Sequence, residues 1–294
     1  MTGAMVFTLP TASASAARCT APAWNASTAY FGQARVSFNG HQYTAKWWSR
    51  GHRPDQFSGR WEEWRHDGAC KGGRATKPPP ANGKAQSTGG FVVTEAQFNR
   101  MFPGRNRFYT YAGLTAAMSK FPAFARTGSD SLRRQEAAAF LANVSHETGG
   151  LVHKVEQNRA NYSNYCDASR PYGCPAGRAA YYGRGPIQLS WNFNYKAAGD
   201  ALGINLLGNP HRVEREAAVA WMTALWYWMT QNGPGRMTAH NAIVGGARFG
   251  ETIRSINGAL ECNGRNQAQV QSRVNAYKRF TQILGVSPGG NLGC

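Results

Sequence analysis

The sequence predicts a small all-β domain followed by a larger, mainly α-helical domain. Three observations support this prediction. Apolar and polar residues alternate in the first part of the chain, a stretch rich in glycine, proline and serine follows at residues 71–90, and from residue 91 onward apolar residues recur at helical spacing. The 294 residues, 42% of them hydrophobic, are enough for one large domain and one small one.

The small domain is predicted at residues 19–70 and is expected to contain a β-hairpin. The dipeptide Asn39-Gly40 lies between two alternating runs, which is the strongest short-range signal for a hairpin turn. The alternating apolar residues are Tyr30, Val36, Phe38, Tyr43, Ala45 and Trp47. Because about 50 residues bury little core, we expect a covalent cross-link in this domain.

Residues 71–90 form a predicted linker, and residues 1–18 a predicted terminal segment. The prolines at positions 78–80 stiffen the linker, while the flanking glycines and serines keep it flexible. Residues 1–18 contain a short apolar stretch and then small residues, which is typical of the end of a signal peptide. A disordered tail explains this segment equally well.

The large domain, residues 91–294, carries clear helix signals. Thr94 and Gln97 have the spacing of a capping box, which predicts a helix start. Helical periodicity of apolar residues predicts further helices over residues 133–147, 213–229 and 267–284. Alternating runs are nearly absent here, so this domain is expected to be helical.

The chain is strongly basic, with 33 Lys and Arg against 15 Asp and Glu and a net charge of +18. The basic residues are scattered, and no nucleic-acid-binding motif is present, so we expect no nucleic-acid partner. Salt-sensitive attraction to anionic cell walls or membranes fits the charge better. No apolar run approaches the roughly 20 residues of a membrane span.

Two nearby carboxylates precede a strip of amides and hydroxyls at residues 181–195. Glu147 follows an apolar helical run and precedes Gly149-Gly150, and Glu156 lies nine residues on. On one continuous helix this spacing would point the two side chains apart. The glycine pair is therefore expected to end the helix, so that Glu156 returns across a cleft. A carboxylic acid and a carboxylate on opposite faces of a sugar are what glycosidic bond cleavage needs.

Residues 91–294 resemble the family 19 glycoside hydrolases, chitinases with a bilobal, lysozyme-like helical fold. The resemblance rests on Ser145 to Gly150, Tyr181 to Tyr195, Ile256-Asn257-Gly258, Glu261-Cys262 and Asn291 to Cys294. It departs from the family at Ala259, where a second glycine is usual, and at Gly293, where aspartate is common. These differences affect loop shape and leave the catalytic positions unchanged.

The resemblance implies a role for each matched residue. It makes Glu147 the general acid, Glu156 the general base of an inverting mechanism, and Ser190 a holder of the attacking water. Carboxyl groups about 6.5–9.5 Å apart leave room for that water. Gln188 and Asn194 become substrate contacts. As an alternative, these polar residues cap the helix that follows Gly185-Pro186; Ser190 can be its N-cap and a water holder at the same time.

Further positions carry weaker implications. Asn257 resembles a substrate-binding amide, and Arg273 a cleft arginine that interacts with the catalytic carboxylates. A structural ion pair between Arg273 and Glu261 is the rival interpretation. Tyr182 and Trp191 are candidates for sugar subsites or for core packing. His146-Glu147 lacks the second histidine of a zinc-protease motif, so no metal site is expected.

Residues 24–64 resemble the small chitin-binding modules of carbohydrate-binding families 5 and 12, through the run Tyr43 to Trp48. Tyr43, Trp47, Trp48 and Trp61 are the candidate sugar contacts. Strand alternation places Trp47 and Trp48 on opposite faces, so one of them is expected in the core and the other on the surface. The sequence leaves open which is which.

The six cysteines contain no Cys-x-x-Cys pair, which makes a zinc site improbable. Proximity in the sequence pairs Cys19 with Cys70. Proximity together with the family resemblance pairs Cys166 with Cys174 and Cys262 with Cys294. Disulfides imply an oxidising compartment.

These features together predict a secreted, monomeric endochitinase that needs no cofactor and acts on chitin and chitooligosaccharides. An antifungal role is a hypothesis that follows from the substrate class. Two rival functions remain at this point: a peptidoglycan hydrolase of similar fold, and a non-catalytic chitin-binding lectin.

Overall fold

The computed structural model describes residues 18–26, 28, 30, 34–45, 49, 53–58, 63–70 and 90–294. The chain separates into two units, residues 1–81 and 82–294, each treated by itself below. The predicted terminal segment, apart from Arg18, and the predicted linker, apart from Gly90, lie outside the described residues. The same holds for Trp47, Trp48 and Trp61.

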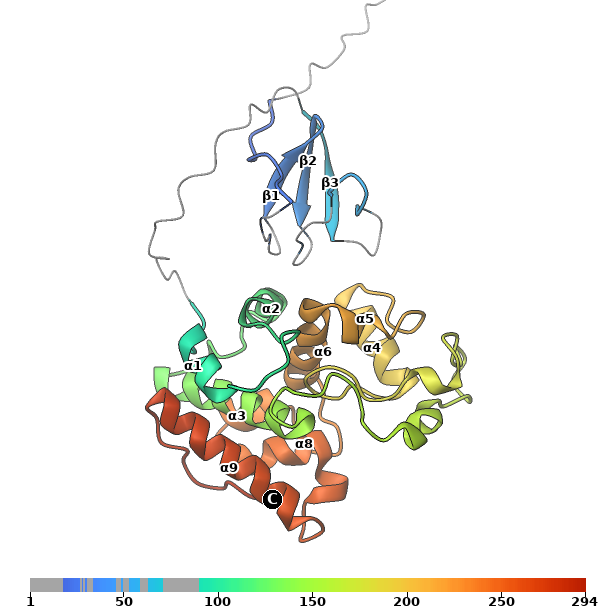
Figure 1. Cartoon of the computed structure of the whole chain (residues 1–294). Helices are drawn as coiled ribbons and strands as arrows, with labels where there is room; N and C mark the ends of the chain where they lie inside the picture. The colour runs from blue at the N-terminus through green and yellow to red at the C-terminus, as the bar shows by residue number, and fades with distance from the viewer. Residues whose placement is uncertain are drawn as a thin grey trace, which may run out of the picture. The chain divides into compact units, whose positions relative to one another are not determined.

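The first unit contains a three-stranded antiparallel sheet in the order β1-β2-β3 (Figure 1). Its strands are β1 Arg35–Phe38, β2 His41–Ala45 and β3 Trp64–Ala69. Asn39 and Gly40 both have positive φ, +47° and +75°, and connect β1 to β2. A two-residue hairpin turn whose twist matches the strands requires this backbone. The predicted hairpin is therefore present.

The core of this sheet explains where one predicted sugar contact lies. Tyr43 is only 4% exposed and packs with Tyr30, Val36, Ala45 and Trp64. The position of Tyr43 in β2 turns its ring into the core, and its predicted contact with sugar stays a prediction. The disulfide Cys19–Cys70 spans the unit and supplies the cross-link that its small core requires.

The second unit is mainly helical. Its α-helices are α1 Glu95–Met101, α2 Tyr111–Ala117, α3 Asp130–Thr148, α4 Asn192–Leu202, α5 Arg212–Arg215, α6 Ala217–Thr230, α7 Ala239–Val244, α8 Phe249–Glu261 and α9 Gln267–Leu284. Three 3₁₀ segments are η1 Met118–Lys120, η2 Arg159–Tyr165 and η3 Arg178–Ala180. Figure 1 shows α9 on one side of this unit and α4 and α5 on the other. The predicted fold class, a mainly α domain with a small β module, is confirmed.

Most helix starts follow the sequence signals. Thr94 and Gln97 form both bonds of a capping box at α1. The predicted helix over 267–284 coincides with α9. The prediction of one helix over 213–229 is wrong, because Glu216 is extended, with φ −116° and ψ 106°, and separates α5 from α6. Arg212 binds the Glu216 carboxylate at 2.6 and 2.8 Å across this break.

The core lies around α3 and α6. Helix α3 packs against α7, α8 and α9, and α6 packs against α2, α4, α5 and α7. The buried Glu136 of α3 accepts hydrogen bonds from the Ala125 amide, the Trp228 indole and the His240 ring. Disulfides Cys166–Cys174 and Cys262–Cys294 are formed as expected. No helix in the described part of the chain is long and apolar enough to cross a membrane.

Candidate active site

Glu147 lies in the last turn of α3, where the chain leaves the helix abruptly. Gly149 and Gly150 have φ of +61° and +82°, and Leu151 follows with φ +62°. The Gly150 amide donates to the Ser145 carbonyl at 2.7 Å, which closes the helix end. The glycine pair thus ends the helix as the sequence predicts, because only glycine adopts such φ values readily in succession.

The Glu147 carboxylate is held by a buried guanidinium. Arg273 of α9 is 0% exposed and hydrogen bonds to Glu147. The same guanidinium donates to both oxygens of Glu261, at 2.7 and 2.8 Å, and to Asn143 Oδ1 at 3.1 Å. Glu147 therefore sits in an ion-pair network at the end of the apolar helix.

The charge of Arg273 also affects the pKa of Glu261. Burial alone would raise the pKa of Glu261, but its hydrogen bond to Arg273 and the charge of Arg273 outweigh burial and hold that pKa below its ordinary value. Asn257 donates to Glu261 Oε1 at 2.8 Å. The resemblance made Arg273 a cleft arginine that interacts with the catalytic carboxylates, and its guanidinium does contact Glu147. The ion pair with Glu261 is present as well. Contact of Arg273 with substrate stays a prediction.

Glu156 lies in the loop that follows the glycine pair. Its amide donates to the Gly183 carbonyl at 2.8 Å, and its Oε1 accepts from Asn161 at 2.9 Å and from the Tyr165 hydroxyl at 3.0 Å. Burial, followed by the hydrogen bond to Glu156 and its charge, raises the pKa of Tyr165 to about 12, so the hydroxyl stays a donor. Two side-chain donors thus hold one oxygen of the Glu156 carboxyl group in place.

The sequence reasoning missed Asn161 and Tyr165. Both lie on η2, five and nine residues after Glu156, and Asn158 caps the start of this segment by accepting from the Ala160 amide. The run of Asn and Tyr in residues 161–165 was the available signal. This run shows neither helical nor strand periodicity, so the sequence did not indicate which of its side chains point toward Glu156.

A cleft of about 570 Å³ brings most predicted site residues together. Its lining includes both carboxylates and five other predicted positions: Glu147, Glu156, Gln188, Ser190, Trp191, Asn194 and Asn257. Tyr227 also lines it, and burial followed by the charge of Glu147 raises the Tyr227 pKa to about 12. Arg273 lines a separate cavity of about 280 Å³ that also contacts Glu147.

The strip at residues 183–194 is shaped by its backbone. Gln188 and Trp191 have φ of +50° and +75°, and the Ser190 hydroxyl donates to the Gln188 carbonyl at 3.1 Å. The Asn194 amide donates to the Ser190 carbonyl at 3.0 Å. Helix α4 begins at Asn192 without a side-chain cap, so the alternative that Ser190 is its N-cap is wrong. The Ser190 oxygen keeps its lone pairs for a group in the cleft.

The two aromatic candidates differ. Trp191 is 37% exposed, lines the cleft and stacks with Phe193 at a centroid separation of 5.5 Å. Tyr182 is not among the described residues that line the cleft; its ring lies between Tyr162 and Arg184. These contacts agree with the packing alternative for Tyr182, and its contact with substrate stays a prediction. Within the described ranges, no three His, Cys, Asp or Glu side chains gather as metal ligands.

Comparison with known proteins places this geometry in a family. A family model described as class I chitinase matches residues 92–294, and one for carbohydrate-binding module family 5/12 matches residues 23–64. Endochitinase A of Zea mays is 46% identical over 211 residues, covering 69% of this chain and 71% of that protein. Endochitinase EP3 of Arabidopsis thaliana is 42% identical over 232 residues, covering 76% and 80%.

Solved structures agree. Chitinase C from Streptomyces griseus HUT6037 is 63% identical with a TM-score of 0.69, covering 93% of this chain and 100% of that chain. A bacterial family 19 chitinase is 72% identical with a TM-score of 0.69, covering 69% of this chain and all of its own. The chain therefore belongs to the family 19 glycoside hydrolases, the class I chitinases, and carries a carbohydrate-binding module of family 5/12.

Proposed function

We propose that this chitinase cleaves chitin internally with Glu147 as general acid, Glu156 as general base and Ser190 as a ligand of the attacking water. The observation that carries the proposal is that one cleft is lined by both carboxylates and by the Ser190 segment. Gln188, Asn194, Asn257 and Trp191, which line the same cleft, are proposed to contact the sugars.

The reaction is a single displacement with inversion. Glu147 donates its proton to the glycosidic oxygen as the bond from the anomeric carbon to that oxygen breaks. Arg273 then stabilises the carboxylate that this step leaves on Glu147. Glu156 takes a proton from the water whose oxygen bonds to the opposite face of the anomeric carbon, and Asn161 and Tyr165 hold its carboxylate for that step.

The remaining parts of the chain fit a secreted enzyme that acts on an insoluble polymer. We propose that residues 19–70 bind chitin, that residues 71–90 act as a linker, and that residues 91–294 carry catalysis. Such tethering raises the local enzyme concentration on the polymer. The three disulfides favour export to an oxidising compartment. We further propose that the enzyme is a monomer and that it has an antifungal role. Residues 1–18 are proposed to be a signal-peptide remnant or a tail.

The test is hydrolysis of an N-acetylglucosamine hexamer, with product anomers resolved at early times. We expect α-anomers from the wild type and a loss of kcat of at least about 100-fold for Glu147→Gln and for Glu156→Gln. β-Anomers would contradict the role of Glu156, and undiminished turnover by Glu147→Gln would contradict the role of Glu147. Peptidoglycan hydrolysis and lectin-like binding are not favoured, since the curated relatives are endochitinases.

A further inference from the structure

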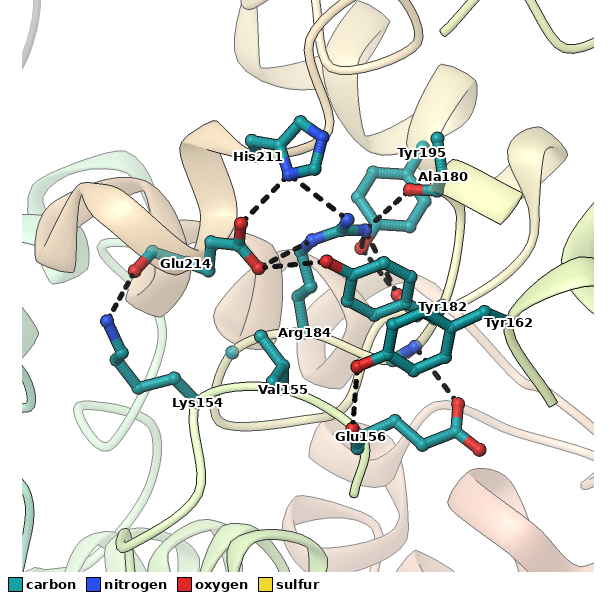
Figure 2. Close-up of polar contacts among 12 residues, drawn as sticks. Lys154, Val155, Glu156, Tyr162, Ala180, Tyr182, Arg184, Tyr195, His211 and Glu214 are labelled. Atoms are coloured by element: carbon teal, nitrogen blue, oxygen red, sulfur yellow. Dashed lines mark hydrogen bonds and ion pairs between the residues drawn. The ribbon is translucent and has the colours of Figure 1, made fainter. Parts of the chain in front are cut away.

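The segment that carries Glu156 belongs to no helix or sheet, since it lies in the loop between α3 and η2. The Glu156 amide donates to the Gly183 carbonyl, and the Glu156 carbonyl accepts from the Tyr162 hydroxyl at 2.9 Å (Figure 2). The direction in which the Glu156 side chain leaves the loop therefore depends on what holds Tyr162 and Gly183.

Tyr162 is held by a stack of three flat groups. Its ring lies face to face with the ring of Tyr182, with centroids 3.6 Å apart and an interplanar angle of 11°. The guanidinium carbon of Arg184 lies 3.5 Å from the same Tyr182 centroid. Two groups this close to one ring must occupy its opposite faces, so Tyr182 is clamped between them (Figure 2). Such contacts are strongest when the cation is desolvated.

Arg184 gives the stack a fixed base, because its side chain is 0% exposed. Its Nε donates to Glu214 Oε2 at 3.0 Å, and its Nη1 donates to the Ala180 carbonyl at 2.7 Å and the Tyr195 hydroxyl at 2.8 Å. His211 contacts the other Glu214 oxygen at 2.8 Å. Although burial opposes it, the His211 hydrogen bond and the Arg184 charge lower the pKa of Glu214, which keeps this pair ionised.

A second anchor joins the same network to the loop just before Glu156. The Lys154 ammonium donates to the Glu214 carbonyl at 3.2 Å. Val155 pairs with Arg184 in an isolated antiparallel bridge, which continues into the amide bond between Glu156 and Gly183. The loop is therefore attached to Glu214 through Lys154 and to Arg184 through Val155 (Figure 2).

We propose that Tyr162 is a positioning residue for Glu156, and that Tyr182 and Arg184 fix Tyr162 through their stack. This proposal rests on the proposed role of Glu156 as general base. Among the described residues that line the cleft, none is Tyr162, Tyr182 or Arg184, so these side chains act through Glu156 and not on the sugar. A shift of the base by about 1 Å costs as much as 100-fold in rate, which makes such positioning kinetically visible.

The experiment is a kinetic double-mutant cycle on the N-acetylglucosamine hexamer. Tyr162→Leu is expected to lower kcat about tenfold while KM stays within about twofold, because the base is displaced but the subsites are intact. Tyr162→Phe keeps the stack and loses one hydroxyl, so its kcat should lie between those of the wild type and Tyr162→Leu. Tyr172→Leu, a tyrosine replacement outside this network, serves as the matched control and should leave kcat within about twofold.

The backgrounds separate positioning from folding. In Glu156→Ala, Tyr162→Leu should have no further effect on kcat, because there is no base left to position. In Glu147→Gln it should still cost about tenfold. Equal losses in both backgrounds would reveal a merely structural role and overturn the proposal, as would wild-type kcat in Tyr162→Leu. Wild-type kcat in Glu156→Ala alone would overturn the role of Glu156 itself, and this proposal with it.

Discussion

Arg273, with no exposed surface, hydrogen bonds to Glu147 at the end of α3. The guanidinium is a rigid, planar group with five N–H donors. Because it is held in place by its other partners, it fixes the rotamer of the carboxylate that it contacts. The same group satisfies Glu261 in two places, so the proposed acid shares its counter-ion with a second, more deeply buried carboxylate. One side chain thereby contacts both carboxylates, so we expect its loss to affect stability and catalysis together.

Replacing Arg273 is expected to harm both properties. Arg273→Gln leaves Glu261 buried without its cation, which should lower the free energy of unfolding by about 3 kcal/mol, and kcat should fall about 100-fold as Glu147 loses its partner. Urea denaturation and hexamer hydrolysis measure the two effects. Lys278→Gln, at an exposed position of the same helix, is the control and should change neither; a stable, fully active Arg273→Gln would refute the coupling.

The stability of the catalytic domain should depend on pH through Glu261. Its pKa in the folded state lies below the ordinary value of 4.5, so the unfolded chain binds more protons between the two values. The stabilisation is complete above 4.5 and is lost as the pH falls through the folded-state pKa. Urea unfolding from about pH 6 to about pH 3 should show this loss, and Glu261→Gln should flatten it. An equally steep pH dependence in Glu261→Gln would argue against this origin.

The two disulfides of the helical unit should contribute unequally. Cys262–Cys294 closes 32 residues, whereas Cys166–Cys174 closes only 8. In the chain-entropy model, removing the longer loop as a double Ser variant should cost about 1 kcal/mol more than removing the shorter one. Thermal and urea unfolding of the two double variants measure the difference. The opposite order would mean that native contacts, such as the hydrogen bond from the Asn263 amide to the Cys294 carbonyl, hold the C-terminus without the disulfide.

The small module should fail independently of catalysis. Trp64 is fully buried among Tyr30, Val36, Tyr43 and Ala45, so Trp64→Ala should cost about 3–5 kcal/mol and unfold the module. Binding to insoluble chitin should then be lost, while kcat on the hexamer stays unchanged. Phe121→Ala, which truncates a half-buried aromatic in the other unit, provides a comparison for general effects of truncation. Loss of hexamer hydrolysis in Trp64→Ala would show that the two units depend on each other.

Local signals predicted the elements whose causes are local. The φ values at Asn39-Gly40, the capping box at Thr94 and the end of α3 at Gly149 each follow from a few neighbouring residues. The bounds of α9 follow from its period and from the αL glycine at position 285. Motif resemblance then located the cleft residues, because those motifs lie in segments that fold back together.

Interactions between segments that are distant in the sequence could not be predicted from the sequence. Arg184 and Glu214 are separated by thirty residues, and nothing in either neighbourhood indicates the partner. Tyr182 lies in a motif that lines the cleft, yet its ring packs between Tyr162 and Arg184, which no local pattern indicates. Similarly, the α5–α6 break depends on the extended backbone of Glu216, which periodicity alone does not reveal.

The glycine pair after Glu147 has a consequence for handedness. Successive φ values of +61° and +82° belong to the mirror-image half of conformational space, where L residues are disfavoured and D residues are at ease. The separation of the proposed acid and base is therefore encoded at the only residues without a chiral centre. Because the genetic code supplies only L residues and glycine, glycine is the residue that adopts these φ values most readily, even though neither glycine takes part in the chemistry.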